Sequence, residues 1–196
     1  SRLPPAMGEL EVLILGDLGA AQHRLGGSIL AQTQSAFGAE VPDLDDPTRL
    51  IALVDAVNAL REKGIVTAYH DRSDGGLWAA VCEMAFAGAV GIDIDLTPLV
   101  RGQVGRETAA LFAEELGALL AVPAARTTEG VAILRDHGLG DLTHVLGASH
   151  HDARLRVSGP RETLIDESLA DLLTAWDEVS WRMSALRDNP ACAAEE

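Results

Sequence analysis

The chain has 196 residues, of which 47% are hydrophobic and 23% are charged. This length corresponds to one ordinary domain, or to one domain with an added segment, and the composition excludes a disordered or low-complexity protein. The formal net charge is −15, so the surface would repel phosphate backbones and anionic lipid heads at long range. We therefore expect no nucleic-acid partner.

The two cysteines, Cys82 and Cys192, lie far apart, and neither belongs to a CxxC motif or a His/Cys cluster. No zinc site or disulfide framework is indicated, and a reducing compartment fits this cysteine usage. The N-terminal residues show no basic segment followed by an apolar core, and no stretch reaches the roughly 18 apolar residues of a membrane span. We expect a soluble, cytoplasmic protein with no membrane partner.

The first half of the chain alternates between strand and helix patterns. Short runs of branched apolar residues predict strands, and apolar residues repeating every three or four positions predict helices. The expected elements are a strand over residues 10–15, a helix from Ser28, a helix from Asp46 to near Gly64, a strand over residues 65–69 and a buried helix over residues 77–87.

The second half continues the alternation and ends in a long amphipathic helix. The expected elements are a strand over residues 91–96, a helix near 105–114, a strand over 118–122, a helix over 124–137, an antiparallel pair of strands at 143–148 and 153–158, and a helix from residue 162 that Pro190 helps to terminate. Residues 161–196 hold nine of the 30 acidic residues but three of the 15 basic ones. We divide the chain into a domain over residues 1–160 and a helix with a linker over residues 161–196.

The segment HDRSDGG, from His70 to Gly76, lies at a predicted junction between a strand and a helix. Such junctions bind anions, because the first amides of a helix are unpaired and glycines let a phosphate approach the backbone. Asp71 and Asp74 can supply hard oxygen ligands for Mg²⁺, and Ser73 can donate to a phosphate oxygen. The same residues also fit a plain helix cap followed by close packing at the glycines. The pattern alone leaves both interpretations open.

Two other segments have residues that bind ligands in some proteins. Arg24 to Ser28, RLGGS, precedes a helix and fits either an anion cradle with Arg24 as charge partner or an ordinary turn capped near Ser28, and we favour the turn. Glu114 and Glu115 end a predicted helix, and we interpret them as a solvated helix end in preference to metal ligands.

The remaining candidate side chains are two histidines and a cysteine. His150 and His151 lie in a polar turn, and adjacent histidines do not easily converge on one ion, so we expect a solvated hairpin. Cys82 lies on the buried helix with no cationic neighbour to lower its pKa, so we expect a core residue and not a nucleophile. The sequence contains no nucleophile elbow from which to assemble a Ser-His-Asp triad.

At HDRSDGG followed by LWAAVCEMAFAGAVGIDIDL, the sequence resembles phosphoribosylformylglycinamidine synthase, the large purine-biosynthetic amidotransferase. The resemblance extends in one order over nearly the whole chain, through residues 13–19, 24–32, 41–43, 112–118, 176–183 and 186–190. Family enzymes are far longer. The chain resembles one piece of the large, single-chain type: the second of two aminoimidazole-ribonucleotide-synthetase-like C-terminal domains, with the helix leading toward the glutaminase.

The resemblance implies an α+β fold, in which a mixed sheet is layered with helices and a long C-terminal helix follows. It also implies a ligase reaction that converts formylglycinamide ribonucleotide, glutamine and ATP to formylglycinamidine ribonucleotide, glutamate, ADP and phosphate. In that reaction ATP activates the substrate amide oxygen, and ammonia from the glutaminase displaces it.

Carried over to this sequence, the family pattern implies that Asp71 is a Mg²⁺ ligand and that Ser73 contacts a nucleotide, ATP or ADP, in an auxiliary site thought to be structural. The glutaminase Cys, His and Glu residues are absent, so no catalytic residue is assigned. The domain that supplies the other metal ligands is absent as well. The loop from Gly19 to His23 departs from the Gly/Asn-rich form usual in the family.

Three hypotheses follow from the resemblance. The chain is a domain of the synthase that is inactive alone and whose partners are the remaining domains, including the glutaminase; or it is a free-standing nucleotide-binding module; or it is a structural interaction module of the same fold. Binding of Mg-ADP to the isolated chain separates the first two, because half of a site should bind weakly.

Overall fold

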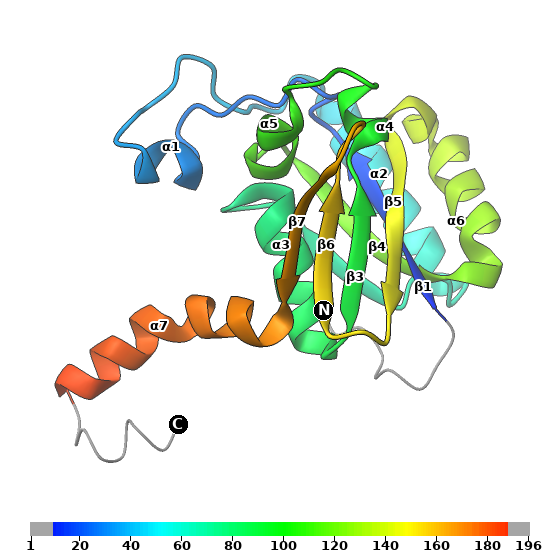
Figure 1. Cartoon of the computed structure of the whole chain (residues 1–196). Helices are drawn as coiled ribbons and strands as arrows, with labels where there is room; N and C mark the ends of the chain where they lie inside the picture. Colours follow the sequence, from blue (N-terminus) through cyan, green and yellow to red (C-terminus); the bar gives the residue numbers. More distant parts are fainter. Residues whose placement is uncertain (1–9, 188–196) are drawn as a thin grey trace.

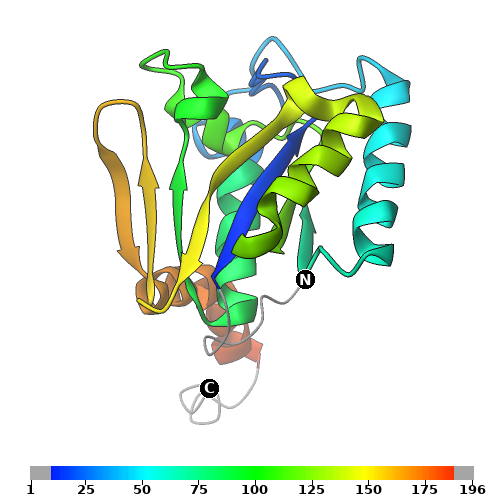
Figure 2. The ribbon, with the colours of Figure 1, turned by 90° about the vertical axis from the view of Figure 1, so that its right-hand side faces the viewer.

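The computed structural model describes residues 10–187, which form a seven-stranded mixed sheet with helices on both faces (Figures 1 and 2). The strand order is β2-β4-β1-β5-β3-β6-β7, and every neighbouring pair is antiparallel except β3 with β6. The strands are β1 (Glu11–Asp17), β2 (Ala68–Asp71), β3 (Gly91–Asp95), β4 (Gly117–Pro123), β5 (Thr143–His150), β6 (Arg154–Ser158) and β7 (Thr163–Ser168). The expected α+β fold is confirmed.

Seven helices connect or follow the strands among the described residues, together with three short helical turns. The helices are α1 (Ile29–Thr33), α2 (Pro47–Glu62), α3 (Gly76–Gly88), α4 (Thr97–Val100), α5 (Glu107–Phe112), α6 (Thr127–Leu134) and α7 (Leu169–Arg187), and the turns are η1 (Ala124–Arg126), η2 (Arg135–Leu139) and η3 (Gly140–Leu142). None of the helices within residues 10–187 combines the length and the apolar character that crossing a membrane requires.

Two apolar cores lie on opposite faces of the sheet, because successive strand residues point to opposite faces. Leu13 and Leu15 of β1 face α3 and α5, whereas Ile14 between them faces α2 and α6. The helix α3 is apolar on nearly all sides and is largely buried, as its composition predicts. The core beneath α3 includes Leu77, Met84, Ile92, Leu111, Leu119 and Leu155, and the core beneath α2 and α6 includes Leu53, Leu60, Leu120, Val122 and Leu134.

The predicted antiparallel pair of late strands is wrong. β5 and β6 run in opposite directions but do not pair, because β3 lies between them and bonds to both. This arrangement places Ile92 and Ile94 of β3 in the centre of the sheet, where β5 and β6 cover both edges of the strand. The antiparallel partner of β6 is β7.

The long C-terminal helix is confirmed, but it begins at Leu169 and not at residue 162, since residues 163–168 form β7. The expected end of this helix at Pro190, like Cys192, lies outside the described residues. The division of the chain at residue 160 stays a prediction. The strand expected over residues 65–69 also starts later, at Ala68, because Ile65 bonds to the end of α2 and packs in the core beneath it.

Gly76 opens α3 with a φ of +68°, and a Cβ on this residue would lie 2.7 Å from the carbonyl oxygen of Leu111. Gly76→Ala therefore meets both backbone strain and overlap, and we expect it to lower the free energy of unfolding by about 3 kcal/mol. Gly64, with a φ of +60° and no atom within 4 Å of such a Cβ, is the matched control. Gly64→Ala should cost about 1 kcal/mol. Equal losses in denaturant unfolding would contradict this account.

Candidate functional site

Four segments meet at one end of the sheet, where β1 and β2 end and β4 and β5 begin (Figure 1). The register aligns Asp17 with Gly117 on β4, and Asp71 with the next residue of β4, Ala118. The loops that follow β1 and β2 therefore start side by side. HDRSDGG, the segment singled out in the sequence, forms the end of β2 and the turn into α3.

Arg72 anchors this turn from inside the protein. Its Nη2 donates to Asp17 Oδ1 over 2.6 Å, and both side chains are fully buried. Its Nε donates to the carbonyl of Glu115 over 2.5 Å, and Nη2 also reaches the carbonyl of Leu116 over 3.1 Å. A buried charge is stable only when it is paired and hydrogen-bonded, and Arg72 has both an ion pair and backbone acceptors.

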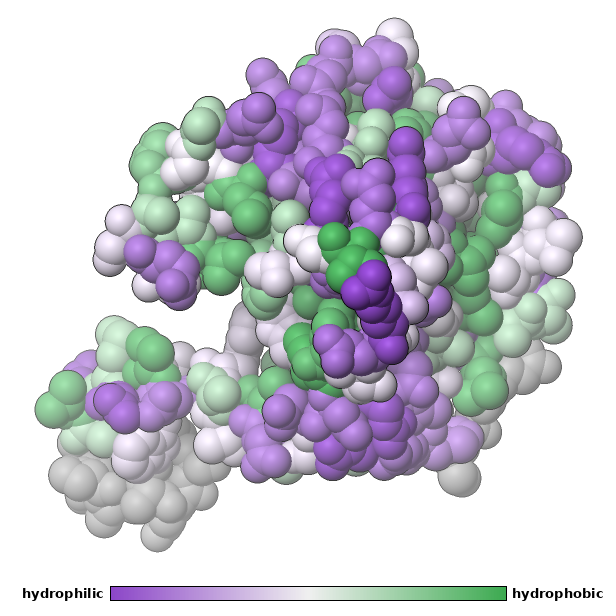
Figure 3. All heavy atoms as spheres, turned by 45° about the horizontal axis from the view of Figure 1, so that its top comes forward, coloured by the Kyte–Doolittle hydropathy of each residue, from purple (hydrophilic) through white to green (hydrophobic). Residues whose placement is uncertain are grey.

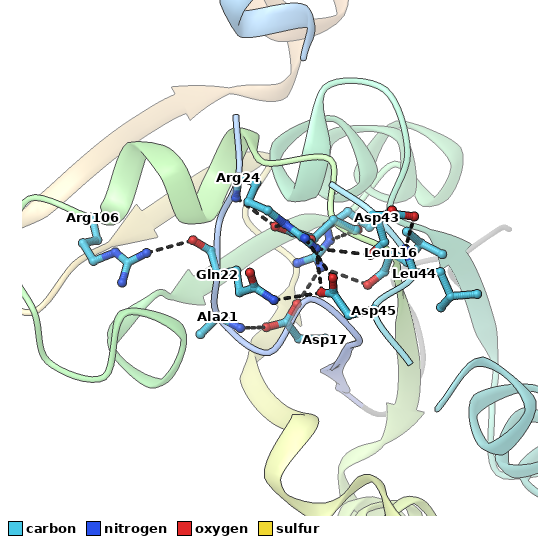
Figure 4. A network of polar contacts seen from close by, with 11 residues as sticks. Asp17, Ala21, Gln22, Arg24, Asp43, Leu44, Asp45, Arg106 and Leu116 are labelled. Atoms are coloured by element: carbon cyan, nitrogen blue, oxygen red, sulfur yellow. Dashed lines mark hydrogen bonds and ion pairs between the residues drawn. The ribbon is translucent and has the colours of Figure 1, made fainter. Parts of the chain in front are cut away.

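A second ion pair fixes the loop after β1 (Figure 4). Glu115 is fully buried and accepts from the Arg24 backbone nitrogen, Nε and Nη2, with separations of 2.7–2.8 Å. The other edge of the Arg24 guanidinium donates to Asp45 over 3.0 and 3.1 Å. These hydrogen bonds raise the pKa of Arg24, and the bonds to Glu115 are the main cause. The charge of Arg24 is therefore matched by two carboxylates of the protein and not by a bound anion.

Glu114 joins the two loops. Its Oε1 accepts from the backbone nitrogen of Gly75, in the turn before α3, over 2.9 Å. The same oxygen accepts from the nitrogen of Ile29, the first residue of α1, over 2.8 Å. The first amide of α1 is thus already bound, and Ser28 caps this helix by accepting from Ala31 over 3.2 Å. The interpretation of RLGGS as a capped turn is confirmed.

The expectation of a solvated helix end at Glu114 and Glu115 is wrong. Glu115 is buried against Arg24, and Glu114 is half-buried between two loops. The reason is tertiary, because the cation and the amides that these carboxylates bind come from distant parts of the chain. Glu114 thus bonds to the turn before α3 and to α1, whereas Glu115 bonds to Arg24 in the loop after β1.

Asp71 and Ser73, the predicted site residues, flank Arg72 and point the other way. Both are exposed, and among residues 10–187 neither side chain has a hydrogen bond or ion pair to another residue. The backbone of the turn is fixed by Gly76, whose nitrogen donates to the Ser73 carbonyl over 2.9 Å, and by the bond of Gly75 to Glu114. The turn thus presents a carboxylate and a hydroxyl to solvent from a rigid base.

The loop from Gly19 to His23 is held in an unusual conformation. Ala20, Ala21 and His23 have φ values of +51°, +62° and +55°, which residues with a Cβ rarely adopt. Asp17 Oδ2 accepts from the Ala21 nitrogen over 2.7 Å, and Arg106 donates to the loop from the far side. Asp17 therefore secures its own loop with one oxygen and Arg72 with the other.

His23, the last residue of this loop, is buried. Its Nε2 lies 3.3 Å from the Leu99 carbonyl oxygen, so Nε2 carries the proton and Nδ1 is an acceptor. Within the described structure, Nδ1 of His23 and Nη1 of Arg72 are buried without a hydrogen-bond partner. Burial lowers the pKa of His23 against the opposing hydrogen bond to Leu99 and the charge of Asp17, so the imidazole is neutral near pH 7.

His150 and Cys82 lie away from this end of the sheet. The expected solvated hairpin at His150 is wrong, because His150 is half-buried and its Nε2 lies 3.0 Å from Asp93 of the intervening strand β3. The core position of Cys82 is confirmed by its exposure of only 5%, and this burial raises the pKa of its thiol to about 12. Such a thiol is not a nucleophile at neutral pH.

The described residues contain no group of three His, Cys, Asp or Glu side chains that could enclose a metal ion. The carboxylate of Asp71 fits Mg²⁺ in chemistry, and it is a single exposed group with no second ligand beside it in the described residues. Mg²⁺ commonly takes one or two carboxylates and completes its octahedron with water and phosphate oxygens. Asp71 by itself is therefore one ligand of the several that Mg²⁺ requires.

Solved structures share this fold at low sequence identity. Thermotoga maritima PurL complexed with ATP matches with a TM-score of 0.66 and 16% identity, over 86% of this chain and 26% of that chain. PurL complexed with FGAR gives a TM-score of 0.66 and 15% identity, over 87% and 29%. HypE of E. coli, a hydrogenase maturation protein, gives 0.55 and 24%, over 83% and 50%. The chain spans about a quarter of the length of the PurL chains.

The strand order and the layered helices thus define an α+β domain of the kind that these larger proteins contain. The family model of the AIR synthase related protein, C-terminal domain, matches residues 10–158. The chain belongs to this family.

The sequence reasoning missed Arg72 and Asp17. Arg72 lies inside the HDRSDGG segment, but the sequence analysis considered its neighbours Asp71 and Ser73, whose side chains are of the types that commonly bind Mg²⁺ and phosphate. Asp17 follows an apolar run, and an acidic residue directly after a buried strand was the available signal. Nothing local connects the two, since 55 residues separate them.

We expect Asp17→Asn to lower the free energy of unfolding by about 3 to 5 kcal/mol, because it leaves the Arg72 charge buried without a counter-ion. Asp166→Asn is the control: Asp166 pairs with Arg154 at 2.6 Å, but both side chains are partly exposed. That change should cost about 1 kcal/mol or less. Denaturant unfolding measures both, and the double variant Asp17→Asn with Arg72→Met should recover part of the loss. A small loss at Asp17 would show that the buried pair is not needed.

The free energy of unfolding should fall as the pH drops from about 7.5 to 5.5. Burial lowers the pKa of His23 in the folded state. As the pH falls through the ordinary value of about 6.5, the unfolded chain therefore binds a proton that the folded chain does not yet bind. The pKa of His144 is lowered in the same direction, also by burial. His23→Gln should flatten this dependence in denaturant titrations at several pH values, whereas His151→Gln, at an exposed turn, should not. An unchanged slope for His23→Gln would exclude His23 as its source.

Proposed function

We propose that the chain is the second AIR-synthetase-like C-terminal domain of a large phosphoribosylformylglycinamidine synthase. The full enzyme would make formylglycinamidine ribonucleotide from formylglycinamide ribonucleotide, glutamine and ATP in the cytoplasm. Support comes from the family match over residues 10–158 and from the shared fold of PurL structures that hold ATP and FGAR. The residues that carry the proposal are in the turn between β2 and α3.

The observation behind this proposal is the opposite orientation of neighbouring residues in that turn. The Arg72 side chain points inward and donates hydrogen bonds to three acceptors. The side chains of Asp71 and Ser73 point outward and have no partner among residues 10–187. Binding residues are often found on loops that a rigid scaffold holds in position. In this arrangement Asp71 binds Mg²⁺ and Ser73 donates to a nucleotide phosphate.

The site is one half of a complete site. A bound Mg²⁺ would neutralise the charge of nucleotide phosphates, and this chain supplies one carboxylate to hold it. The other ligands come from the partner domains of the synthase, which also include the glutaminase that releases ammonia. The isolated chain is therefore inactive as a ligase, and its nucleotide site has an auxiliary, structural role.

Calorimetry with Mg-ADP tests the half-site. The isolated chain should show no binding tighter than about 0.1 mM, because most of the coordinating groups are missing. Tight binding would favour the second candidate, a free-standing nucleotide-binding or interaction module of the same fold. Product formed by the chain alone from substrate, ATP and ammonia would contradict the proposal outright.

In the complete synthase, Asp71→Asn should lower the amount of Mg-nucleotide that remains bound after purification by about tenfold. Asp74→Asn is the matched control, since Asp74 is an exposed carboxylate in the same turn. Both variants should unfold within about 0.5 kcal/mol of the parent chain, because neither carboxylate has a partner to lose. Nucleotide content that stays at the parent level in Asp71→Asn would remove Asp71 from the metal site, and an equal loss in both variants would place Asp74 there as well.

A further inference from the structure

The apolar surface of the domain does not specify a partner. Hydrophobic side chains gather on the arm that carries α1 and again on α7 (Figure 3), and nothing among residues 10–187 shows what covers them. The polar contacts at the end of β2 are more informative, because a hydrogen bond has a direction and a measured length. One set of these contacts is made by His70, the residue before Asp71.

The imidazole of His70 has a hydrogen-bond partner at each ring nitrogen. Nδ1 lies 2.7 Å from the carbonyl oxygen of Asp71, and Nε2 lies 2.5 Å from Oε2 of Glu83 on α3. The His70 side chain is 15% exposed, so water competes little for these two bonds. Neither His70 nor Glu83 is a ligand in the proposed half-site, and their contacts therefore have a different role.

The acceptors determine where the hydrogens of the ring lie. A backbone carbonyl can only accept, so Nδ1 of His70 carries a hydrogen and donates it to Asp71. Nε2 and Glu83 share a second hydrogen, whichever of the two groups carries it, because two bare acceptors would repel each other. The direction of the bond to Asp71 is the same in both cases. His70 is thus a donor to the backbone of the next residue.

This bond holds one end of a peptide unit whose other end is also bonded. The N–H of the peptide between Asp71 and Arg72 donates to the carbonyl of Gly117 on β4 over 2.9 Å. The carbonyl of the same peptide accepts from His70. Because a peptide unit is planar, bonds at both of its ends fix its rotation. That rotation sets the direction in which the Asp71 side chain leaves the backbone.

Glu83 in turn holds the ring of His70. It lies in the middle of α3, between Cys82 and Met84, which are buried in the core. β2 is at the edge of the sheet, and β4 is its only strand neighbour among residues 10–187. The bond between His70 and Glu83 therefore ties an edge strand to a buried helix. Through His70, the backbone of Asp71 is held by α3 as well as by β4.

We propose that His70 is a positioning residue of the nucleotide half-site, which aims the carboxylate of Asp71 at Mg²⁺ by holding the carbonyl of the same residue. The inference rests on the proposed function, in which Asp71 is the metal ligand. His70 acts through Asp71 and is not itself a ligand. The Asp71 carboxylate has no partner among residues 10–187, so the backbone sets its direction. Removing a group that orients a metal ligand commonly weakens metal binding by about 10- to 100-fold.

Three variants of His70 in the complete synthase separate its two bonds. An asparagine amide takes the place of Nδ1 and a glutamine amide that of Nε2, so His70→Asn keeps the bond to Asp71 and His70→Gln keeps the bond to Glu83. The Mg-nucleotide that remains bound after purification should fall about tenfold in His70→Ala and His70→Gln. In His70→Asn it should stay within about twofold of the parent. Any other ranking overturns the proposal, and retention by His70→Gln alone would show that the ring only ties β2 to α3.

Asp71→Asn, measured beside these variants, separates the inference from the function on which it rests. A loss in Asp71→Asn without a loss in His70→Ala overturns the positioning role alone. Parent content in Asp71→Asn overturns the proposed function and the positioning role together. His151→Ala is the matched control, because His151 is exposed at a turn, and it should keep the parent content. The circular dichroism spectrum of each variant verifies that the fold is retained.

A second measurement detects the bond itself, without nucleotide. In the 196-residue chain with isotope-labelled histidine, long-range proton–nitrogen correlation spectra should show a hydrogen on Nδ1 of His70. Glu83→Gln keeps a hydrogen-bonding partner for Nε2 and should leave this hydrogen in place. A bare Nδ1 overturns the proposal, since His70 then donates nothing to Asp71.

Discussion

The ion pair between Arg72 and Asp17 is the constraint on which the loops at one end of the sheet depend. Both side chains are removed from water, which is unfavourable unless each charge is matched and its remaining hydrogen-bonding capacity is used. One carboxylate oxygen of Asp17 accepts from Arg72, and the other accepts from the loop after β1. Arg72 also donates to two backbone carbonyls in the segment before β4. One buried contact thus fixes three loops at once, and the positions of all three follow from it.

The second pair, Arg24 with Glu115, extends this constraint outward. The residue after Glu115 bonds to Arg72 through its carbonyl, so the two ion pairs share one short segment before β4. Together they explain why Asp71 and Ser73 stand on a stable base although both are exposed. Along the chain, the buried side chain of Arg72 lies between the exposed side chains of Asp71 and Ser73. A turn of this construction holds its exposed polar groups in fixed positions.

Two surfaces of the domain expose side chains that have few contacts within the described residues, one surface polar and the other apolar. The turn before α3 exposes polar side chains that have no partner among residues 10–187, and the second half of α7 exposes apolar side chains beyond its contact with α3. Both features fit a family whose structural relatives are much longer proteins. In the acidic last fifth of the chain, Glu178 of α7 pairs with Arg182 one turn further along the helix.

The sequence by itself determined the elements with strong local patterns: the buried strand β1, the capped helix α2, the apolar helix α3 and the turn with Asp71 and Ser73. These depend on residues close together in the chain, which is why periodicity and capping rules find them. Only the tertiary structure decided that β3 separates β5 from β6, that Glu115 is buried, and that Arg72 pairs with Asp17. Each of these depends on a partner dozens of residues away. A charged residue in a sequence looks the same whether water solvates it or a distant side chain pairs with it.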